Sequence, residues 1–236
     1  MDLSQQLLIA MNLLFNFDEN LYEIINMSLY VSVSATIIAS ILALPLGILI
    51  GISNFPFKNT IIAVLNGLMG FPPVVLGLFG YLLFSRIGPL GDLGILYTPT
   101  VMILTQTFLI LPIITAHIRT ISQSTFETSK IYYYMIGATK IQTITSLLWE
   151  IRFIVFTAIM AGLGRALSEV GAMLIVGGNI NGHTRIMTTA ISLETGKGNL
   201  GFALALGIVL LSIILFISFV MTMINHYGER KYYAKN

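Results

Sequence analysis

The sequence predicts an all-α protein that crosses a membrane several times. Hydrophobic residues make up 56% of the 236 residues and charged residues only 9%, against roughly 25% charged residues in soluble domains. The mean hydropathy is +0.89, and five separate apolar segments are each long enough to span a bilayer. The chain has no cysteine, which excludes disulfides and thiolate metal sites. A polytopic helical membrane protein with one transmembrane domain, residues 1–236, is therefore expected.

The five candidate spans each contain about 20 residues or more, the length that a helix needs to cross about 30 Å of hydrocarbon. The second span contains Gly70, Pro72 and Pro73, and the third contains Pro112, so bends are expected where neighbouring groups can satisfy the freed backbone. Pro72 and Pro73 are either a kink in a translocation path or a tolerated bend. The spans are expected at residues 27–52, 60–84, 98–118, 151–177 and 201–225.

The N-terminal segment is predicted to be an amphipathic helix at the membrane interface, over about residues 3–17. Its apolar run, Leu7 to Phe17, is too short to cross the hydrocarbon and is followed by Asp18 and Glu19. It lacks the basic start and the small-residue cleavage site that are typical of a signal peptide.

Lysine and arginine residues predict the orientation of the spans. Most of them fall after the first, third and fifth spans, and the positive-inside rule places such segments in the cytoplasm. The N-terminus is then outside and the C-terminus inside, in a cytoplasmic membrane. The residues expected inside are Lys58, Arg119, Lys130, Lys140, Arg152, Arg230, Lys231 and Lys235, and those expected outside are Arg86, Arg185 and Lys197.

Residues 119–150 form the longest polar stretch and are expected to be a cytoplasmic loop. Polar and apolar residues alternate there at helical spacing, and Gly137 offers a tight turn. The pattern predicts a short helix–turn–helix, which either docks in a groove of a partner or lies on the lipid headgroups.

An arginine and a glutamate lie in the middle of the fourth predicted span. Arg165 and Glu169 are four residues apart and would share one helix face. Charges within the hydrocarbon are costly and usually mark a pathway, a relay or an ion pair. The two residues are either a gate near a translocated ion or an ion pair that braces helix packing.

Beyond this span, Gly177, Gly178 and Asn179 predict the end of a helix. Thr184 and Arg185 follow in a loop that is expected outside. Their donor groups either meet an anion there or belong to a solvated loop that touches a partner.

Three segments together resemble one known family. Ile136-Gly137-Ala138-Thr139-Lys140 resembles the centre of the coupling motif of ABC-importer permeases, although Lys130-Ile131-Tyr132-Tyr133 and Trp149-Glu150 replace that motif's usual start and end. GRALSEVGA at residues 164–172 resembles the Arg-x-x-Ser-Glu-x-Gly stretch of molybdate and tungstate permeases, with a similar GGN-containing loop behind it. GFPPVVLGL at residues 70–78 resembles their proline-containing core helix.

The resemblance implies a type I ABC-importer permease fold and import of an oxyanion, tungstate first and molybdate next. It implies a second copy of the chain, two cytoplasmic subunits that bind ATP and Mg, and an external oxyanion-binding protein. Residues 119–150 would be the coupling loop, with Tyr134 and residues 136–140 contacting the ATPase. The candidate path or gate comprises Pro72, Pro73, Arg165, Ser168, Glu169, Thr184 and Arg185.

The chain itself is expected to be neither an enzyme nor a cofactor protein. It has no GxxxxGK[ST] motif, and its net charge of +2 does not indicate nucleic-acid binding. The alternatives are an ion- or proton-coupled carrier that uses Glu169 as a relay, and a membrane enzyme or assembly scaffold. His117, His183 and His226 are scattered, which argues against the enzyme.

Overall fold

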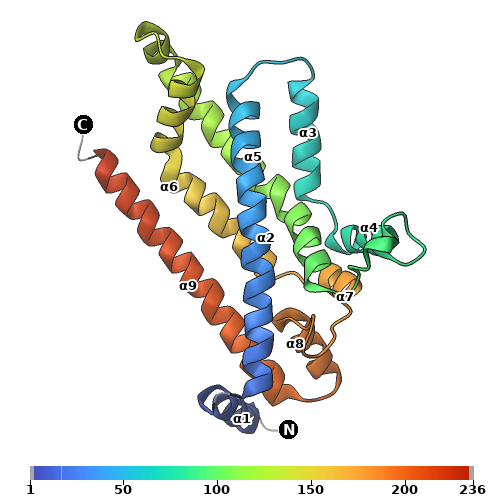
Figure 1. The fold of residues 1–236 in the computed structure, drawn as a ribbon. Coiled ribbons are helices and arrows are strands. Elements are labelled where there is room, and N and C mark those ends of the chain that lie inside the picture. The colour runs from blue at the N-terminus through green and yellow to red at the C-terminus, as the bar shows by residue number, and fades with distance from the viewer. Residues whose placement is uncertain (1–2, 17, 234–236) are drawn as a thin grey trace. The chain divides into compact units, whose positions relative to one another are not determined.

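The computed structural model describes residues 3–16 and 18–233. Phe17, the last residue of the predicted N-terminal apolar run, and Lys235 lie outside this part of the chain. The regular structure of the described residues is helical throughout (Figure 1). Backbone contacts divide the chain into two compact units, which are described separately. Unit 1 comprises Met1–Ala35, Phe71–Leu109 and Gly164–Phe216, and unit 2 comprises Thr36–Gly70, Ile110–Leu163 and Ile217–Asn236.

Among the described residues, four helices are long and apolar enough to cross a membrane, and there are up to five spans if the two helices on either side of residues 70–72 count as one. This confirms the expected all-α polytopic class. A helix also forms in the N-terminal segment. The helices are α1 (Leu3–Phe15), α2 (Glu19–Ile52), α3 (Lys58–Met69), α4 (Pro73–Phe84), α5 (Pro99–Met135), α6 (Lys140–Leu167), α7 (Gly171–Gly177), α8 (Met187–Gly196) and α9 (Leu200–Tyr233), with a 3-10 turn η1 at Gly91–Leu93.

The second predicted span consists of two helices, α3 and α4, and the interruption follows from its glycine and prolines. Gly70 ends α3, and Pro72 is extended with ψ 120°. A residue before proline avoids the helical region, and proline fits the first position of a helix because its missing N–H is not needed there. Pro73 accordingly begins α4.

The fourth predicted span is also interrupted, and the expectation of one helix over residues 151–177 is wrong. Helix α6 ends at Leu167, and the short helix α7 begins only at Gly171. Arg165 therefore lies in the last turn of α6, and Glu169 lies in the break rather than in the middle of a span.

Residues 119–150 are almost entirely helical rather than a loop. Helix α5 continues through Pro112 to Met135, and α6 begins at Lys140. The helix–turn–helix is confirmed, but its two helices are extensions of the long helices α5 and α6. The turn itself comprises only residues 136–139.

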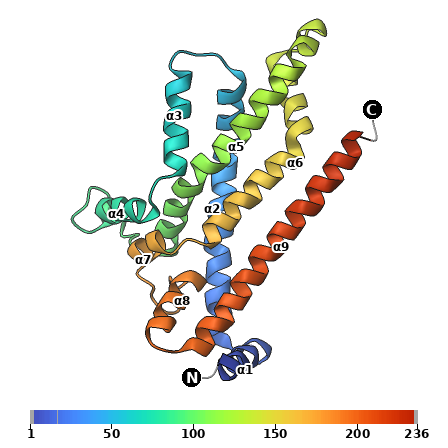
Figure 2. The same cartoon turned by 180° about the vertical axis from the view of Figure 1, so that it is seen from behind.

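Helix α7 is central to the core of unit 1. It packs against α4 (Figure 2), where the small residues of α4 allow a close approach: a Cβ added at Gly77 would lie 2.8 Å from Ala172 Cα, and one added at Gly80 would lie 3.0 Å from Val176 Cγ1. The buried apolar cluster around this contact consists of Val31, Val101, Met102, Ala172, Met173, Val176 and Ile186.

Buried polar residues of α5 also hold unit 1 together. The fully buried Gln106 donates from Nε2 to the carbonyl of Ala166, at the end of α6, and lies 3.4 Å from Ser32 Oγ on α2. Thr107 Oγ1 lies 3.4 Å from the carbonyl of Ala35. These polar side chains make interhelical hydrogen bonds, and Gln106 adds a second hydrogen bond to the carbonyl of Ala166, which also accepts from the Glu169 N–H at 3.3 Å.

In unit 2, α2 and α5 approach closely through a G-x-x-x-G pattern. A Cβ added at Gly47 would lie 2.7 Å from Ile118 Cγ2, and one added at Gly51 would lie 2.9 Å from the carbonyl of Arg119. Small residues spaced by four allow such contacts between membrane helices. Lys58 Nζ then donates to the carbonyls of Gly51, at 3.1 Å, and Ser53, at 2.9 Å, and so caps the end of α2.

The α4–α7 contact predicts the effect of enlarging Gly77. Gly77→Val forces methyl groups into the backbone of Ala172, which cannot move aside as a flexible side chain could. Overpacking of this kind costs about 1–3 kcal/mol, so we expect a lower thermal midpoint in detergent. Gly67→Val in α3 is the matched control, because an added Cβ there has nothing within 4 Å. Equal midpoints for the two variants would contradict the packing described here.

Candidate functional site

The predicted functional residues gather in two places. Tyr134 and residues 136–140 lie at the turn between α5 and α6 in unit 2, which we call the coupling turn (residues 136–139). The predicted path residues all belong to unit 1, at the start of α4, at the α6–α7 break and in the loop after α7.

Gly137 lies just after the end of α5, in a backbone conformation that favours glycine. Its φ is +64°, which glycine adopts without steric cost. The Ala138 N–H donates to the carbonyl of Tyr133 at 3.0 Å, and the Gly137 N–H donates to that of Tyr134 at 3.2 Å. This pair of bonds is the Schellman arrangement, which satisfies the last carbonyls of a helix.

A reciprocal cap begins α6 immediately afterwards. The Thr139 N–H donates to Gln142 Oε1 at 2.8 Å, and the Gln142 N–H donates to Thr139 Oγ1 at 3.3 Å. This is a capping box, whose Thr-x-x-Gln signature is present in the sequence. The two helix ends are thus fixed by local bonds within a few residues, so the coupling turn is a rigid feature.

Apolar side chains project from both sides of the coupling turn. Tyr134, Met135 and Ile136 are 73%, 75% and 56% exposed, and Ile141 is 75% exposed. We call these four residues the apolar tip. Thr139 and Lys140 are also exposed, whereas Ala138 is half-buried. A compact apolar surface on a rigid turn is suited to docking in a groove of another protein.

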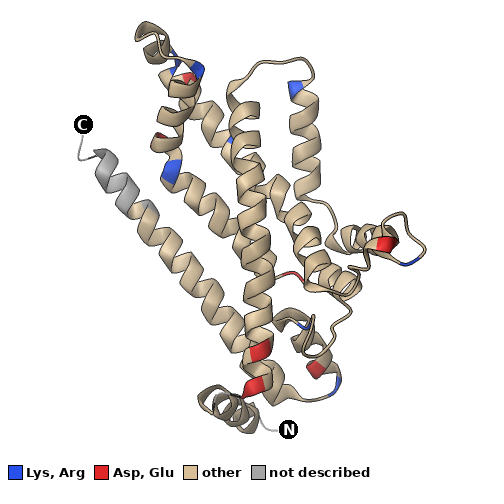
Figure 3. Cartoon of the chain, in the orientation of Figure 1, with Lys and Arg blue, Asp and Glu red and all other residues tan. Residues whose placement is uncertain are grey.

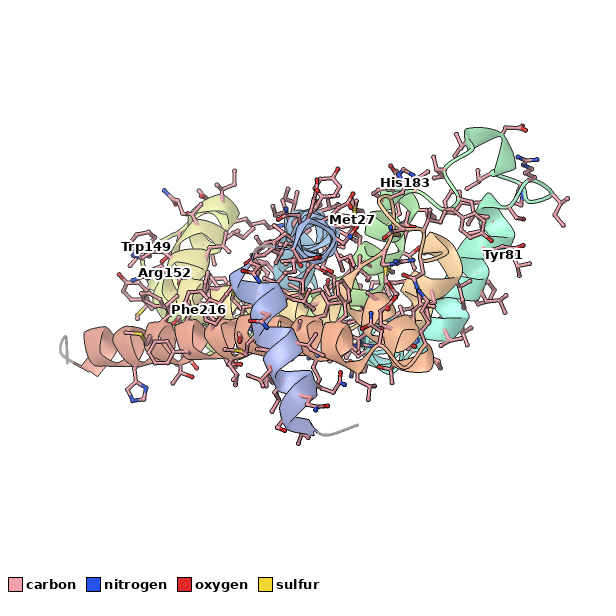
Figure 4. The ribbon with its side chains drawn as sticks, turned by 90° about the horizontal axis from the view of Figure 1, so that it is seen from below. Met27, Tyr81, Trp149, Arg152, His183 and Phe216 are labelled. Carbon is pink, nitrogen blue, oxygen red and sulfur yellow. The ribbon has the colours of Figure 1, made fainter. Side chains whose placement is uncertain are left out.

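Farther along α6, Trp149 and Arg152 lie side by side (Figure 4). The guanidinium carbon of Arg152 is 4.3 Å from the centre of the Trp149 ring and 4.4 Å from that of Phe153. Cation–π contacts of this kind stabilise a charge beside aromatic rings, and an exposed tryptophan with an arginine is typical of a membrane interface.

Glu169 forms the centre of the α6–α7 break. Its Oε2 accepts a hydrogen bond from Arg165 Nη1 at 2.9 Å, and its Oε1 accepts one from the Ala172 N–H at 3.1 Å. Its backbone carbonyl accepts from Thr188 Oγ1 at 2.7 Å. The Glu169 side chain is only 5% exposed, whereas that of Arg165 is 36% exposed. The ion pair is therefore confirmed, and it also caps the first turn of α7.

The predicted residues of α4 and of the α6–α7 break lie close together. A Cβ added at Gly171 would lie 2.5 Å from Val74 Cγ2, and Val74 follows Pro73 directly. Ser168 is exposed, and its hydroxyl donates to the carbonyl of Arg165 at 3.0 Å.

Thr184 is fully buried and holds the loop after α7 together. Its Oγ1 accepts from the Ile180 N–H at 3.0 Å and donates to the carbonyl of Gly177. Arg185 is half-buried and donates from Nη1 to Asn181 Oδ1 at 2.9 Å. The geometry thus gives Thr184 a structural role in this loop.

Charged residues are sparse along the helices, and most lie near helix ends or connections (Figure 3). At the end of α8, Lys197 Nζ donates to Glu194 Oε1 at 2.9 Å, and Asn199 Nδ2 donates to Glu194 Oε2 at 2.9 Å. The hydrogen bond from Lys197 lowers the pKa of Glu194, against the opposing effect of burial, and Asn199 lowers it further. Because the folded pKa is lowered, this connection stabilises the fold above the ordinary carboxyl pKa and loses that contribution as the pH falls through the folded value.

Within residues 3–16 and 18–233, no group of three or more histidine, cysteine, aspartate or glutamate side chains is placed to hold a metal ion. The sequence interpretation did not identify Gln142, and it did not predict the particular hydrogen bonds of Thr188 and Gln106. The capping-box spacing could have identified Gln142, whereas the roles of Thr188 and Gln106 depend on tertiary contacts that no local pattern encodes.

The contacts of Glu169 predict that a single substitution of Arg165 lowers stability more than a double substitution of Arg165 and Glu169. Arg165→Met leaves a buried carboxylate without its cation and lowers stability. The cost is less than the about 3–5 kcal/mol of a fully buried pair, because Arg165 is 36% exposed. Adding Glu169→Gln removes the stranded charge but keeps an oxygen for the Ala172 N–H, so the double variant recovers thermal stability in detergent.

Gly164→Ala is the matched control beside the pair, because a Cβ added at Gly164 has nothing within 4 Å. A brace predicts that stability and transport fall and recover together across these variants. An Arg165→Met protein of unchanged stability that has lost transport would instead place the pair in the gate.

Comparison with known proteins identifies the family. No family model matches the chain. The tungstate uptake system permease protein TupB of Peptoclostridium acidaminophilum is 43% identical over 204 residues, 86% of this chain and 90% of that protein. A probable anion ABC transporter permease of Haloferax volcanii is 40% identical, over 83% of this chain and 86% of that protein. TupB of Campylobacter jejuni is 35% identical, over 94% of this chain and 91% of that protein. With these relatives aligned over most of its length, the chain belongs to the oxyanion-type family of ABC-transporter permeases.

Proposed function

We propose that this chain is the permease subunit of an ATP-driven importer of tungstate, with molybdate as the next candidate substrate. Two relatives that align over about nine-tenths of their own length are named tungstate uptake permeases. The structural observation that carries the proposal is the coupling turn, in which a rigid, doubly capped connection presents an apolar tip.

In this proposal the chain supplies the path, and its partners supply energy and substrate. Two cytoplasmic subunits bind ATP and Mg, and a groove on each receives one coupling turn. A second copy of the chain completes the path about a two-fold axis, because a path between like subunits needs a symmetric interface. An external binding protein delivers the oxyanion. The permease itself is neither an enzyme nor a cofactor protein.

The proposed orientation places the coupling turn and the C-terminus in the cytoplasm and the N-terminus outside. Its support is the distribution of lysine and arginine between the connecting segments. The helix α1 then lies at the outer interface.

Within unit 1, we assign the anion-facing role to Ser168, and a bracing role to Arg165, at the α6–α7 break. Both are accessible at least in part, and Arg165 is a cation. Glu169, which would repel an anion, is turned into the fold and neutralised by Arg165. Pro72 and Pro73 contribute by placing α4 beside this break, and Thr184 and Arg185 contribute by shaping the loop after α7.

The contacts of Glu169 argue against a proton-coupled carrier. A relay must exchange protons with water during each cycle. Both carboxylate oxygens of Glu169 instead accept hydrogen bonds within the fold, from Arg165 and from the backbone of Ala172.

The docking role of the coupling turn is tested with Gly137→Trp. An added Cβ at Gly137 has nothing within 4 Å, so the chain should fold with only the local strain of a positive φ. The indole should then clash with the ATP-binding subunit, and we expect at least a tenfold loss of ATPase capture in pull-down together with loss of tungstate uptake.

Gly94→Trp is the matched control. Gly94 has a φ of +59°, and an added Cβ there also has nothing within 4 Å, but Gly94 lies in unit 1. The control should keep ATPase capture and uptake. Normal ATPase capture and normal tungstate uptake by Gly137→Trp would contradict the docking role.

A further inference from the structure

Unit 2 contains an open cavity of about 490 Å³ beside the coupling turn. It lies between the C-terminal end of α2 and the parts of α5 and α6 that flank the turn. Two lysines from different helices, Lys130 and Lys140, line it together with the buried Tyr133 and the exposed Asn54. Its volume is within the range of about 300–1,000 Å³ that ligand sites have.

The cavity continues into an apolar groove. A second hollow, of about 310 Å³, is lined only by apolar residues of α2 and α6. Leu49 and Ile144 line both spaces, so the two adjoin. The residues of the groove are Leu44, Pro45, Ile48, Leu49, Ile144 and Leu148.

No carboxylate side chain lines the cavity. Two ion pairs of the described residues are Arg165–Glu169 and Lys197–Glu194, and neither involves Lys130 or Lys140. Glu127, one turn before Lys130, is exposed and does not line the cavity. Two cations therefore face one space that has no carboxylate in its lining.

The end of α2 indicates the depth of the site. The groove follows the last turns of α2, a helix long and apolar enough to span the membrane. The cavity begins where α2 ends, at Ile52 and Ser53. We therefore expect the apolar part within the hydrocarbon and the cationic part at its boundary.

We propose that the cavity and the groove are one binding site for an anionic phospholipid. The ammonium groups of Lys130 and Lys140 hold the headgroup phosphate, and one acyl chain occupies the groove between α2 and α6. Basic pockets between membrane helices bind anionic headgroups in this way. A soluble anion would leave the apolar groove unused, whereas a lipid matches both parts. This site goes beyond the proposed transport function and needs only a membrane around unit 2.

The single tryptophan of the chain provides the test. Trp149 directly follows Leu148, which lines the groove, and is 71% exposed. The full-length protein is placed in phosphatidylcholine vesicles containing an increasing share of phosphatidylglycerol with brominated acyl chains, which quench nearby tryptophan. We expect quenching to saturate at a lower share of brominated phosphatidylglycerol than of brominated phosphatidylcholine. We call the ratio of these two shares, phosphatidylcholine over phosphatidylglycerol, the preference. Each lysine should contribute a factor of about five to the preference.

Two variants separate the parts of the site. Lys130→Gln with Lys140→Gln should reduce the preference to about one, whereas Arg86→Gln, which removes a cation of unit 1, should not. Leu49→Phe should fill the groove and also remove the preference with both lysines intact. Leu46→Phe is its matched control, because Leu46 lies on the same helix, is 44% exposed and does not line the groove.

The proposal would be overturned if the preference were unchanged in Lys130→Gln/Lys140→Gln or in Leu49→Phe. The cavity would then be a contact site for a partner subunit or a second copy. Loss of the preference on addition of excess inorganic phosphate would overturn the proposal in favour of a soluble anion. Circular dichroism and gel filtration establish that each variant is folded. The assay uses neither tungstate nor the ATPase, so its result is independent of the transport proposal.

Discussion

A break between two helices leaves backbone N–H and C=O groups without their regular helical partners, and unit 1 is organised around one such break. Glu169 accepts from the Ala172 N–H and so caps α7, while Gln106 donates to the carbonyl of Ala166 at the end of α6. Thr188 donates to the carbonyl of Glu169. Side chains from α5, α8 and the break itself therefore supply hydrogen bonds to these groups, alongside the one from the Glu169 N–H to the carbonyl of Ala166.

With its backbone groups satisfied, the break ends α6 and allows α7 to pack against α4. That contact requires small residues, because Gly77 and Gly80 bring the α4 backbone within van der Waals distance of α7. The charge of Glu169 requires Arg165, since a buried carboxylate without a cation would be costly. The same interruption therefore explains three features of unit 1: the ion pair, the glycines of α4 and the polar residues of α5.

The sequence was sufficient to predict the class, the approximate spans and the position of the coupling turn. Hydropathy identifies the segments that can lie in lipid. Gly137 predicts a tight turn, because glycine adopts a positive φ without steric cost. The Thr139-x-x-Gln142 cap was also readable in the sequence, although it was missed. The interruption after Leu167 was not predictable from hydropathy, because a window average does not detect whether a carboxylate replaces a helical hydrogen bond.

The same reasoning explains what was misjudged at the candidate site. The sequence predicts Thr184 as a donor in an outside loop, either for an anion or in contact with solvent and a partner. In the structure Thr184 is buried, and its two hydrogen bonds depend on how residues 177–184 fold back. The hydrogen bonds of Gln106 on α5 were not predictable from a local pattern, because its partners lie on α2 and α6. The phospholipid site combines residues about 90 positions apart, and no pattern along the chain brings them together.

The central claim is that this chain moves an oxyanion with energy delivered through the coupling turn. The most direct measurement is tungstate uptake into vesicles that contain the permease together with its ATP-binding subunit and binding protein. The account predicts uptake that requires ATP on the side of the ATP-binding subunit and continues when a protonophore collapses the proton gradient. Uptake by the permease alone, without ATP and abolished by the protonophore, would contradict it.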